Sequence, residues 1–204
     1  MILYVESNFV LELAFLREEH DACLELLQLA TAQKVNLVLP AFSIGEPYEA
    51  WVRRANKRRD LHEKLTAEIR ELARSKPYRQ SSEDFLGVTE LLTKSGEEEK
   101  HRLDETLNRI LNLAEVIPID LPTIKTSINL QKSHGLSPQD SIVFASVLAH
   151  LKSTAGKTAC FITKNSRDFS VVEVKEDLVK YNCKILFKFS DGLGYVQSQI
   201  PISG

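Results

Sequence analysis

The stretch Ile2-Leu3-Tyr4-Val5-Glu6-Ser7-Asn8 opens the sequence with an apolar run that is followed at once by an acidic residue and two polar residues. A short apolar run with polar boundaries is typical of a strand that is buried on both faces of a sheet. In open α/β sheets the functional crevice lies beyond the carboxyl ends of such strands. We therefore expect Glu6 to lie at that crevice.

Three further segments deliver an acidic residue in a similar way. The apolar run 37–39 leads into a helix-like stretch that carries Glu46, and the run 160–162 leads into a turn that carries Asp168. Asp140 stands at the head of a small, apolar helical stretch. Because the carboxyl ends of parallel strands meet at one edge, these acids can converge there, and a convergent acidic cluster is a candidate divalent-metal site.

Short apolar segments alternate with helical patterns along the chain, which favours a parallel sheet covered by helices on both faces. The strands that the pattern predicts cover residues 2–5, 36–39, 116–119, 159–162 and 184–187. Right-handed crossovers would bring their carboxyl ends to one edge. A chain of 204 residues suits one domain with an insertion.

The insertion is expected at about residues 47–115, a long, highly charged and helix-permissive segment between the second and third strands. One amphipathic helix is marked by Leu61, Leu65, Ile69 and Leu72, and another by Leu103, Leu107, Ile110, Leu111 and Ala114. Between them, Pro77 and Gly87 predict a break followed by a short helix around residues 85–92. The segment is thus predicted to form a helical arm beside the crevice.

Composition limits the remaining function classes. With 43% apolar and 26% charged residues the chain resembles a soluble globular protein, and a net charge of −2 gives no overall attraction to polyanions. The three cysteines and five histidines show no metal-ligand spacing, so zinc is disfavoured and reduced core thiols are expected. Neither a signal sequence nor a membrane span is predicted, and a cytoplasmic location is therefore expected.

The four acidic segments together resemble the PIN domain, a nuclease fold found in bacterial VapC-type toxin ribonucleases and in eukaryotic RNA-processing nucleases. The family's Asp-Ser/Thr-Asn after its first strand corresponds to Glu6-Ser7-Asn8, and its glutamate on the helix after the second strand corresponds to Glu46. Its aspartate at the head of a small helix corresponds to Asp140, and its Thr-x-Asn-x-x-Asp-Phe turn to residues 163–169. The resemblance implies a three-layer α/β/α, PIN-like fold with a mainly parallel sheet of about five strands.

One position departs from the family pattern. Glu6 stands where the family normally has aspartate, and its carboxylate reaches one methylene further. Mg²⁺ demands near-ideal octahedral geometry at about 2.0–2.1 Å, so this change shifts where a metal would sit. The resemblance covers about the first fifty residues and those from about 115 onward, whereas the arm is longer than in the compact toxins.

The resemblance also implies roles for individual residues. The expected catalytic acids are Glu6, Glu46, Asp140 and Asp168. Mg²⁺ or Mn²⁺ would be held by Glu6, Asp140 and Asp168, with Glu46 a further ligand or a positioner of the attacking water. Supporting hydrogen bonds are expected from Asn8, Thr163 and Asn165. Asn165 and Asp168 compete for the fourth site position.

Structural roles predict some of the same residues. Glu6 suits a helix N-terminus, where the helix dipole favours an acid, and Asp140 suits the first turn after Ser137-Pro138. Asp168 could cap a short helix, and Thr163 and Asn165 could serve only to form the turn. Glu46 could belong to a solvated helical face, because Glu49 follows three residues later.

A basic run lies just after Glu46. It places five cations within seven residues, namely Arg53, Arg54, Lys57, Arg58 and Arg59. Such a cluster favours contact with RNA phosphates, and Tyr48 and Trp51 could stack on unpaired bases. The alternative is a solvated helical face with both aromatic residues buried.

We therefore predict a metal-dependent endoribonuclease, with RNA as its substrate. The alternative is a catalytically weak or inactive PIN-like module that binds RNA or protein. A small-molecule α/β protein is disfavoured because a Gly-rich phosphate-binding loop is absent. A toxin role would imply an antitoxin partner by analogy, and a homodimer could form through apolar arm residues such as Phe85, Leu86 and Leu92.

Overall fold

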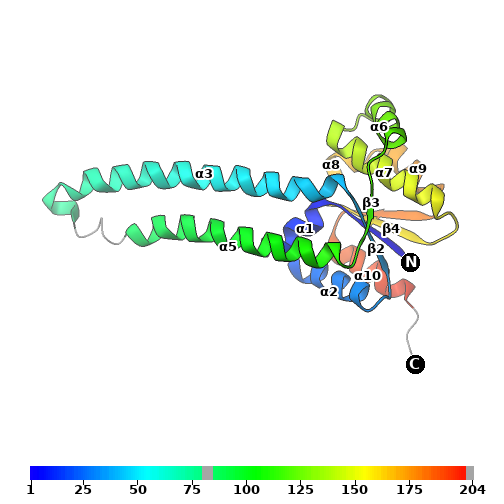
Figure 1. Cartoon of the computed structure of the whole chain (residues 1–204), viewed down its shortest axis with the longest axis horizontal. Coiled ribbons are helices and arrows are strands. Elements are labelled where there is room, and N and C mark those ends of the chain that lie inside the picture. The colour runs from blue at the N-terminus through cyan, green and yellow to red at the C-terminus, as the bar shows by residue number, and fades with distance from the viewer. Residues whose placement is uncertain (80–84, 201–204) are drawn as a thin grey trace.

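The protein is built around a five-stranded parallel sheet in the order β3-β2-β1-β4-β5, and the computed structural model describes residues 1–79 and 85–200 (Figure 1). The strands are β1 (Ile2–Val5), β2 (Asn36–Pro40), β3 (Glu115–Ile117), β4 (Ala159–Ile162) and β5 (Cys183–Leu186). The predicted α/β fold is confirmed. The third strand was wrongly extended to residue 119, because β3 pairs with β2 only as far as Ile117.

Helices cover both faces of the sheet. One face packs against α1 (Ser7–Ala14), α2 (His20–Thr31) and α10 (Phe189–Gln199). The other face packs against α6 (Leu121–His134), α7 (Pro138–Ser153), the short α8 (Ser166–Phe169) and α9 (Val172–Val179). Alternation along β1 sends Leu3 and Val5 into the first core and Ile2 and Tyr4 into the second. The predicted three-layer arrangement follows from these two cores.

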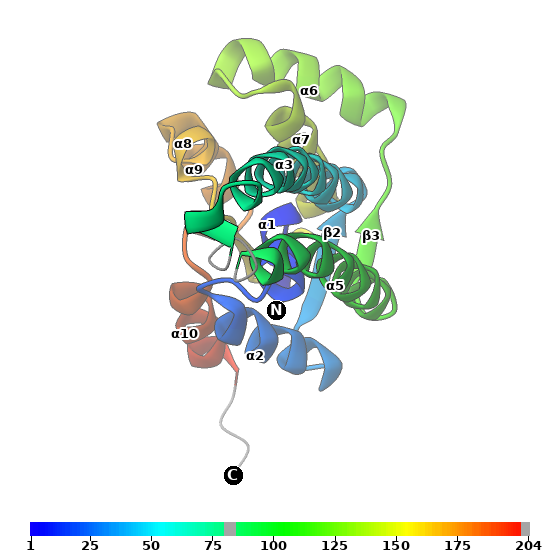
Figure 2. The same cartoon turned by 90° about the vertical axis from the view of Figure 1, so that its left-hand side faces the viewer.

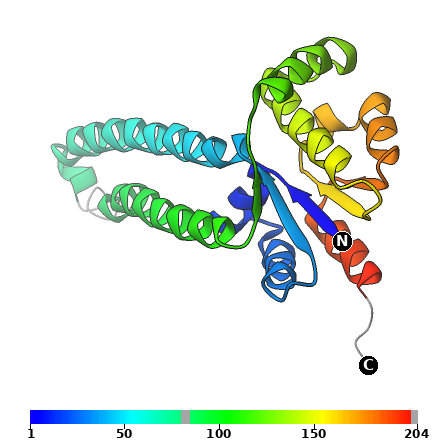
Figure 3. The same cartoon turned by 45° about the vertical axis from the view of Figure 1, so that its right-hand side comes forward.

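Two long helices, α3 (Phe42–Ala73) and α5 (Leu86–Leu111), lie side by side and project from the sheet as an arm (Figures 1 and 3). The 3₁₀ turn η1 (Lys76–Tyr78) follows α3 at the far end, and residues 80–84 of the predicted break lie outside the described residues. Seen along the arm, α3 lies between α7 and α5 (Figure 2). The base of the arm belongs to the first core, through Leu103, Leu107 and Ile110 of α5.

The arm differs from its prediction in two respects. Helix α3 begins at Phe42, so Glu46 lies on the same helix that forms the arm. The predicted short helix around residues 85–92 is wrong, because α5 continues without a break through Gly96. A single helical glycine costs only about 1 kcal/mol relative to alanine, which the packing of α5 on α3 offsets.

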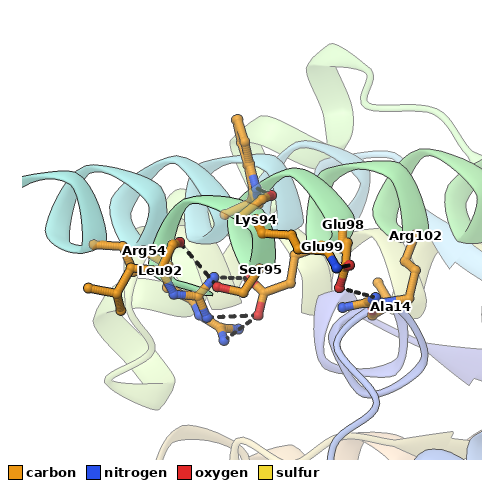
Figure 4. Close-up of polar contacts among 11 residues, drawn as sticks. Ala14, Arg54, Leu92, Lys94, Ser95, Glu98, Glu99 and Arg102 are labelled. Carbon is orange, nitrogen blue, oxygen red and sulfur yellow. Dashed lines mark hydrogen bonds and ion pairs between the residues drawn. The ribbon is translucent and has the colours of Figure 1, made fainter. Parts of the chain in front are cut away.

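Polar side chains join the two arm helices near their base. The carboxylate of Glu99 is buried and accepts hydrogen bonds from Arg54 at 2.9 Å and from Arg58 at 2.8 and 2.9 Å. The indole Nε1 of Trp51 donates to the carbonyl of Gly96 at 3.0 Å. Figure 4 shows Arg54 and Glu99 facing each other between the helices. These bonds fix the rotation of α3 against α5.

The three cysteines, Cys23, Cys160 and Cys183, are free and buried, as predicted. Burial raises the pKa of the Cys160 thiol to about 12, so this side chain is a neutral core residue near pH 7. Within the described ranges, no helix is long and apolar enough to span a bilayer.

Gly192 gives a test of how closely α10 approaches the sheet. A Cβ at this position would overlap Cδ1 of Ile162, which is fully buried in β4. We expect Gly192→Ala to lower the free energy of unfolding by about 1–3 kcal/mol because the core must shift. Urea denaturation measures this change.

Gly194→Ala is the matched control on the same helix. No atom lies within 4 Å of a Cβ built on Gly194, so this variant should be neutral or more stable by up to about 1 kcal/mol. Equal effects of the two substitutions would contradict the close approach at Gly192.

Candidate functional site

Acidic residues from three segments meet at the carboxyl edge of the sheet. Glu6 follows β1, Glu46 lies on α3 after β2, and Asp140 lies in the first turn of α7. These carboxylates line one open cavity of about 350 Å³ together with Asn165, which follows β4. The predicted convergence of Glu6, Glu46 and Asp140 therefore has a physical basis in the parallel sheet.

Glu6 is the N-cap of α1, and its carboxylate is saturated with hydrogen bonds. One oxygen accepts from Ser7 Oγ at 2.7 Å and from Asn8 N at 3.2 Å. The other oxygen accepts from Asn8 Nδ2 at 2.6 Å and from Thr163 Oγ1 at 2.9 Å. A carboxylate offers about four lone-pair positions, and all are occupied here. Glu6 thus lies at a helix N-terminus, as its structural role predicted, and the same residue lines the cavity.

Asp140 is held by two side-chain donors. Ser137 Oγ donates to one of its oxygens and Asn165 Nδ2 donates to the other at 2.9 Å. Burial raises the pKa of Asp140, the hydrogen bond from Ser137 opposes this shift, and the nearby negative charge of Asp168 raises the pKa further. Ser137 also caps α7 by accepting from Asp140 N at 3.1 Å, so the expected first-turn role is present too.

Glu46 belongs to the acidic cluster rather than to a solvated face. Burial is the main cause of its raised pKa; a hydrogen bond involving Ser7 lowers it, and the charges of Glu6 and Asp140 raise it. Glu49, in contrast, is exposed and pairs with Arg53 at 3.6 Å. Glu46 and Glu49 therefore have different environments although they lie on the same helix.

The fourth position is divided between two residues. Asn165 lines the cavity described above, and it also lines a second cavity together with Glu46 and Asp140. It is the N-cap of α8, where its Oδ1 accepts weakly from Asp168 N at 3.4 Å. Asp168 lines neither cavity, and its charge acts on the Asp140 carboxyl. Asn165 therefore faces the open site, and Asp168 supports it from α8.

The oxygen atoms of the site are of the kind that a hard divalent cation binds, but among the described residues they are not arranged as a complete set of metal ligands. Carboxylate and amide oxygens are the ligands that Mg²⁺ and Mn²⁺ prefer. Across residues 1–79 and 85–200, no three acidic, histidine or cysteine side chains are already arranged to hold a metal ion. Glu6 explains part of this, since both of its oxygens are turned to protein donors.

Sequence reasoning missed an ion pair beside the acids. Lys164 lines the same cavity, and its Nζ donates to Oε1 of Glu12 at 2.9 Å. Glu12 is only 1% exposed, and its second oxygen accepts from Glu19 N. The available signal was a charged residue within the otherwise apolar helical stretch after Asn8. This pair anchors the turn that carries Thr163 and Asn165.

The predicted RNA-binding cations do not share one environment. Arg54 and Arg58 are bound to Glu99 inside the arm. Arg53 lines a second open cavity of about 350 Å³ with Glu46, Asp140 and Asn165. The two remaining cations, Lys57 and Arg59, are exposed.

The aromatic and apolar arm residues also separate. Tyr48 and Trp51 are partly buried and hydrogen-bond to α5, Tyr48 through Asp104 at 2.8 Å. Phe85 is exposed, Leu92 is partly buried, and the side chain of Leu86 lies outside the described part of the structure. The exposure of these side chains does not test the predicted homodimer, which remains a prediction.

The raised pKa of Glu46 predicts how the stability of the protein depends on pH. Its folded-state pKa lies above the ordinary glutamate value of 4.5, so ionisation costs folding free energy, and this cost appears as pH rises through and above that value. We expect Glu46→Gln to stabilise the protein at pH 7 and to lose this advantage below about pH 4.5. Urea denaturation across this pH range measures it, with the exposed Glu49→Gln as control. A gain that does not depend on pH would contradict the proposed cause.

Comparison with known proteins agrees with this geometry. The PIN domain family model matches residues 3–169, which include the acids of the site and the whole arm. No curated protein and no solved structure matches the chain. Because the family match covers most of the chain and both of its ends lie in the α/β core, this chain belongs to the PIN domain family.

Proposed function

We propose that this protein is a metal-dependent endoribonuclease that hydrolyses RNA phosphodiester bonds. PIN domains are generally nucleases, and the chain belongs to that family. The observation that carries the proposal is the meeting of Glu6, Glu46 and Asp140 around one open cavity at the carboxyl edge of the sheet. Mutual repulsion among such carboxylates is relieved when a divalent cation binds.

Mg²⁺ or Mn²⁺ would be held by the acids that face the cavity. Glu46 and Asp140 are the carboxylates whose pKa is raised there, and Asp168 would support Asp140. A bound cation would lower the pKa of a water and stabilise charge on the phosphate. Glu6 would act mainly through its position, since it already binds Ser7, Asn8 and Thr163.

The other polar residues of the site would orient these groups. Asn165 donates to Asp140, and Thr163 donates to Glu6, so each neutral side chain holds a carboxylate in place. Two cations lie beside the acids. Lys164, which is bound by Glu12, lines one cavity, and Arg53 lines the other. Arg53, whose ion pair is exposed to solvent, would attract a phosphate that flanks the cut.

The alternative function is a PIN-like module that binds RNA without cutting it. The saturated carboxylate of Glu6 supports this alternative, because a ligand that is fully hydrogen-bonded must give up donors before it can bind a metal. Arg53, which lines a cavity beside the acids, would contact RNA in either case.

The biological setting is a further part of the proposal. A toxin role would require an antitoxin that restrains the nuclease, and the exposed Phe85 could contribute to a homodimer. Three free, buried thiols are compatible with a reducing compartment, and we therefore place the activity in the cytoplasm.

Cleavage of a panel of single-stranded and structured RNAs with Mn²⁺, Mg²⁺ or EDTA tests the function. We expect cleavage only with the metals, and we expect Asp140→Asn to slow it by at least about 100-fold because a charge that faces the phosphate site is lost. Asp191→Asn is the matched control, since Asp191 is also a first-turn acid but lies on α10.

Cutting that persists in EDTA, or that Asp140→Asn leaves intact, would refute the metal-dependent mechanism. RNA binding without cutting by both the wild type and Asp140→Asn would favour the binding module instead.

A further inference from the structure

Helix α3 presents its cations on different sides. With 3.6 residues per turn, Arg53 and Lys57 lie about two and three turns after Glu46 on the same face of the helix. Arg54 and Arg58 lie on a different side and bind Glu99 of α5. The basic run therefore contains one subset that follows the acidic cavity and another that holds the arm together.

The first subset is available to a ligand. Arg53 lines a cavity with Glu46, Asp140 and Asn165, so its guanidinium stands beside the acidic centre. Its ion pair with Glu49 spans 3.6 Å between side chains that are 66% and 74% exposed. Such exposed pairs are weak and easily displaced.

Lys57 continues the same face of the helix. It is exposed, and within the described residues it makes no ion pair. Arg59, only two residues later, instead lines a cavity between α3 and α5 with Trp51 and His62. Asp60, about one turn beyond Lys57, brings a negative charge to the edge of this face and ends the basic run.

The spacing of these cations suits the phosphates of one strand. Arg53 and Lys57 are one helical turn apart, about 6 Å along the axis of α3. Phosphates of a stacked strand follow each other at about 3.4 Å along its axis, and those of an extended strand lie further apart along it. One row of cations on the helix can therefore contact phosphates of the same strand that are at most about two nucleotides apart.

We propose that the phosphates of one RNA strand run outward from the acidic cavity along this face of α3, contacting Arg53 first and Lys57 second. This inference rests on the proposed function, and it adds that the substrate must extend on one particular side of the cut. Lys57 lies about 16 Å from Glu46 along the helix, which corresponds to at most about five nucleotides.

A nested series of single-stranded RNAs tests this path. The main cut site is first located on a long RNA, and either flank is then shortened one nucleotide at a time. We expect cleavage to fall steeply when one flank becomes shorter than a threshold of at most about five nucleotides, and to tolerate shortening of the other flank. Cleavage that depends equally on both flanks, or on neither, would overturn the proposal.

Lys57→Ala and Arg59→Ala form a matched pair on the same helix. For Lys57→Ala we expect slower cleavage of long RNA and no further loss when the outermost nucleotide of the required flank is removed, because the contact is already absent. Arg59→Ala should keep the length profile of the wild type. The same profile in both variants would overturn the assignment of Lys57.

Binding measured in EDTA by fluorescence anisotropy separates this inference from the proposed function. The slope of log affinity against log salt should decrease by about 0.7 in Lys57→Ala and stay unchanged in Arg59→Ala. If long RNA is never cut, the nuclease proposal fails, yet this difference in slope would still support the path along α3. Equal slopes in both variants would overturn the path even if cleavage occurs.

Discussion

The buried carboxylate of Glu6 is the constraint on which the site depends. It ends β1, caps α1 and accepts a hydrogen bond from Thr163 at the end of β4. A buried, ionised carboxylate without hydrogen-bond partners lowers the free energy of unfolding by several kcal/mol. The hydrogen bonds that Ser7, Asn8 and Thr163 donate to Glu6 must therefore stay in place. This single side chain therefore couples two neighbouring strands and the first helix at the edge where the other acids gather.

The same edge gives chemically similar residues different properties. The carboxylate of Glu6 accepts hydrogen bonds from Ser7, Asn8 and Thr163. Burial and neighbouring charges raise the pKa of Glu46 and of Asp140, because they outweigh the hydrogen bonds of these two carboxylates. Lys164 is largely neutralised by the buried Glu12, while Arg53 remains exposed beside the acids. A cluster with uncompensated negative charge and open access has the electrostatics that favour a divalent cation.

Helix α3 links the site to the arm. It carries Glu46 near its start and the basic run along its next turns, so the orientation of the arm and the position of a site carboxylate are set by one rigid element. The packing of Arg54 and Arg58 on Glu99 fixes the rotation of this helix, and thereby fixes which cations face the cavity. A count of basic residues alone would overstate the charge that is available to RNA, because a buried ion pair is already occupied.

The sequence by itself determined the strands, their parallel arrangement and the segments that bring acids to the carboxyl edge, because these features depend on local periodicity and on the short polar stretches after buried runs. It also predicted that Asn8, Thr163 and Asn165 hydrogen-bond the carboxylates or the scissile phosphate, and each of them donates to a carboxylate of the site. Only the tertiary structure decided that Glu6 is saturated, that Arg54 and Arg53 face different sides, that α5 runs through Gly96, and that Glu12 holds Lys164. The physical reason is that a side chain's partner is chosen by packing between segments that are distant in the chain, which local sequence patterns do not encode.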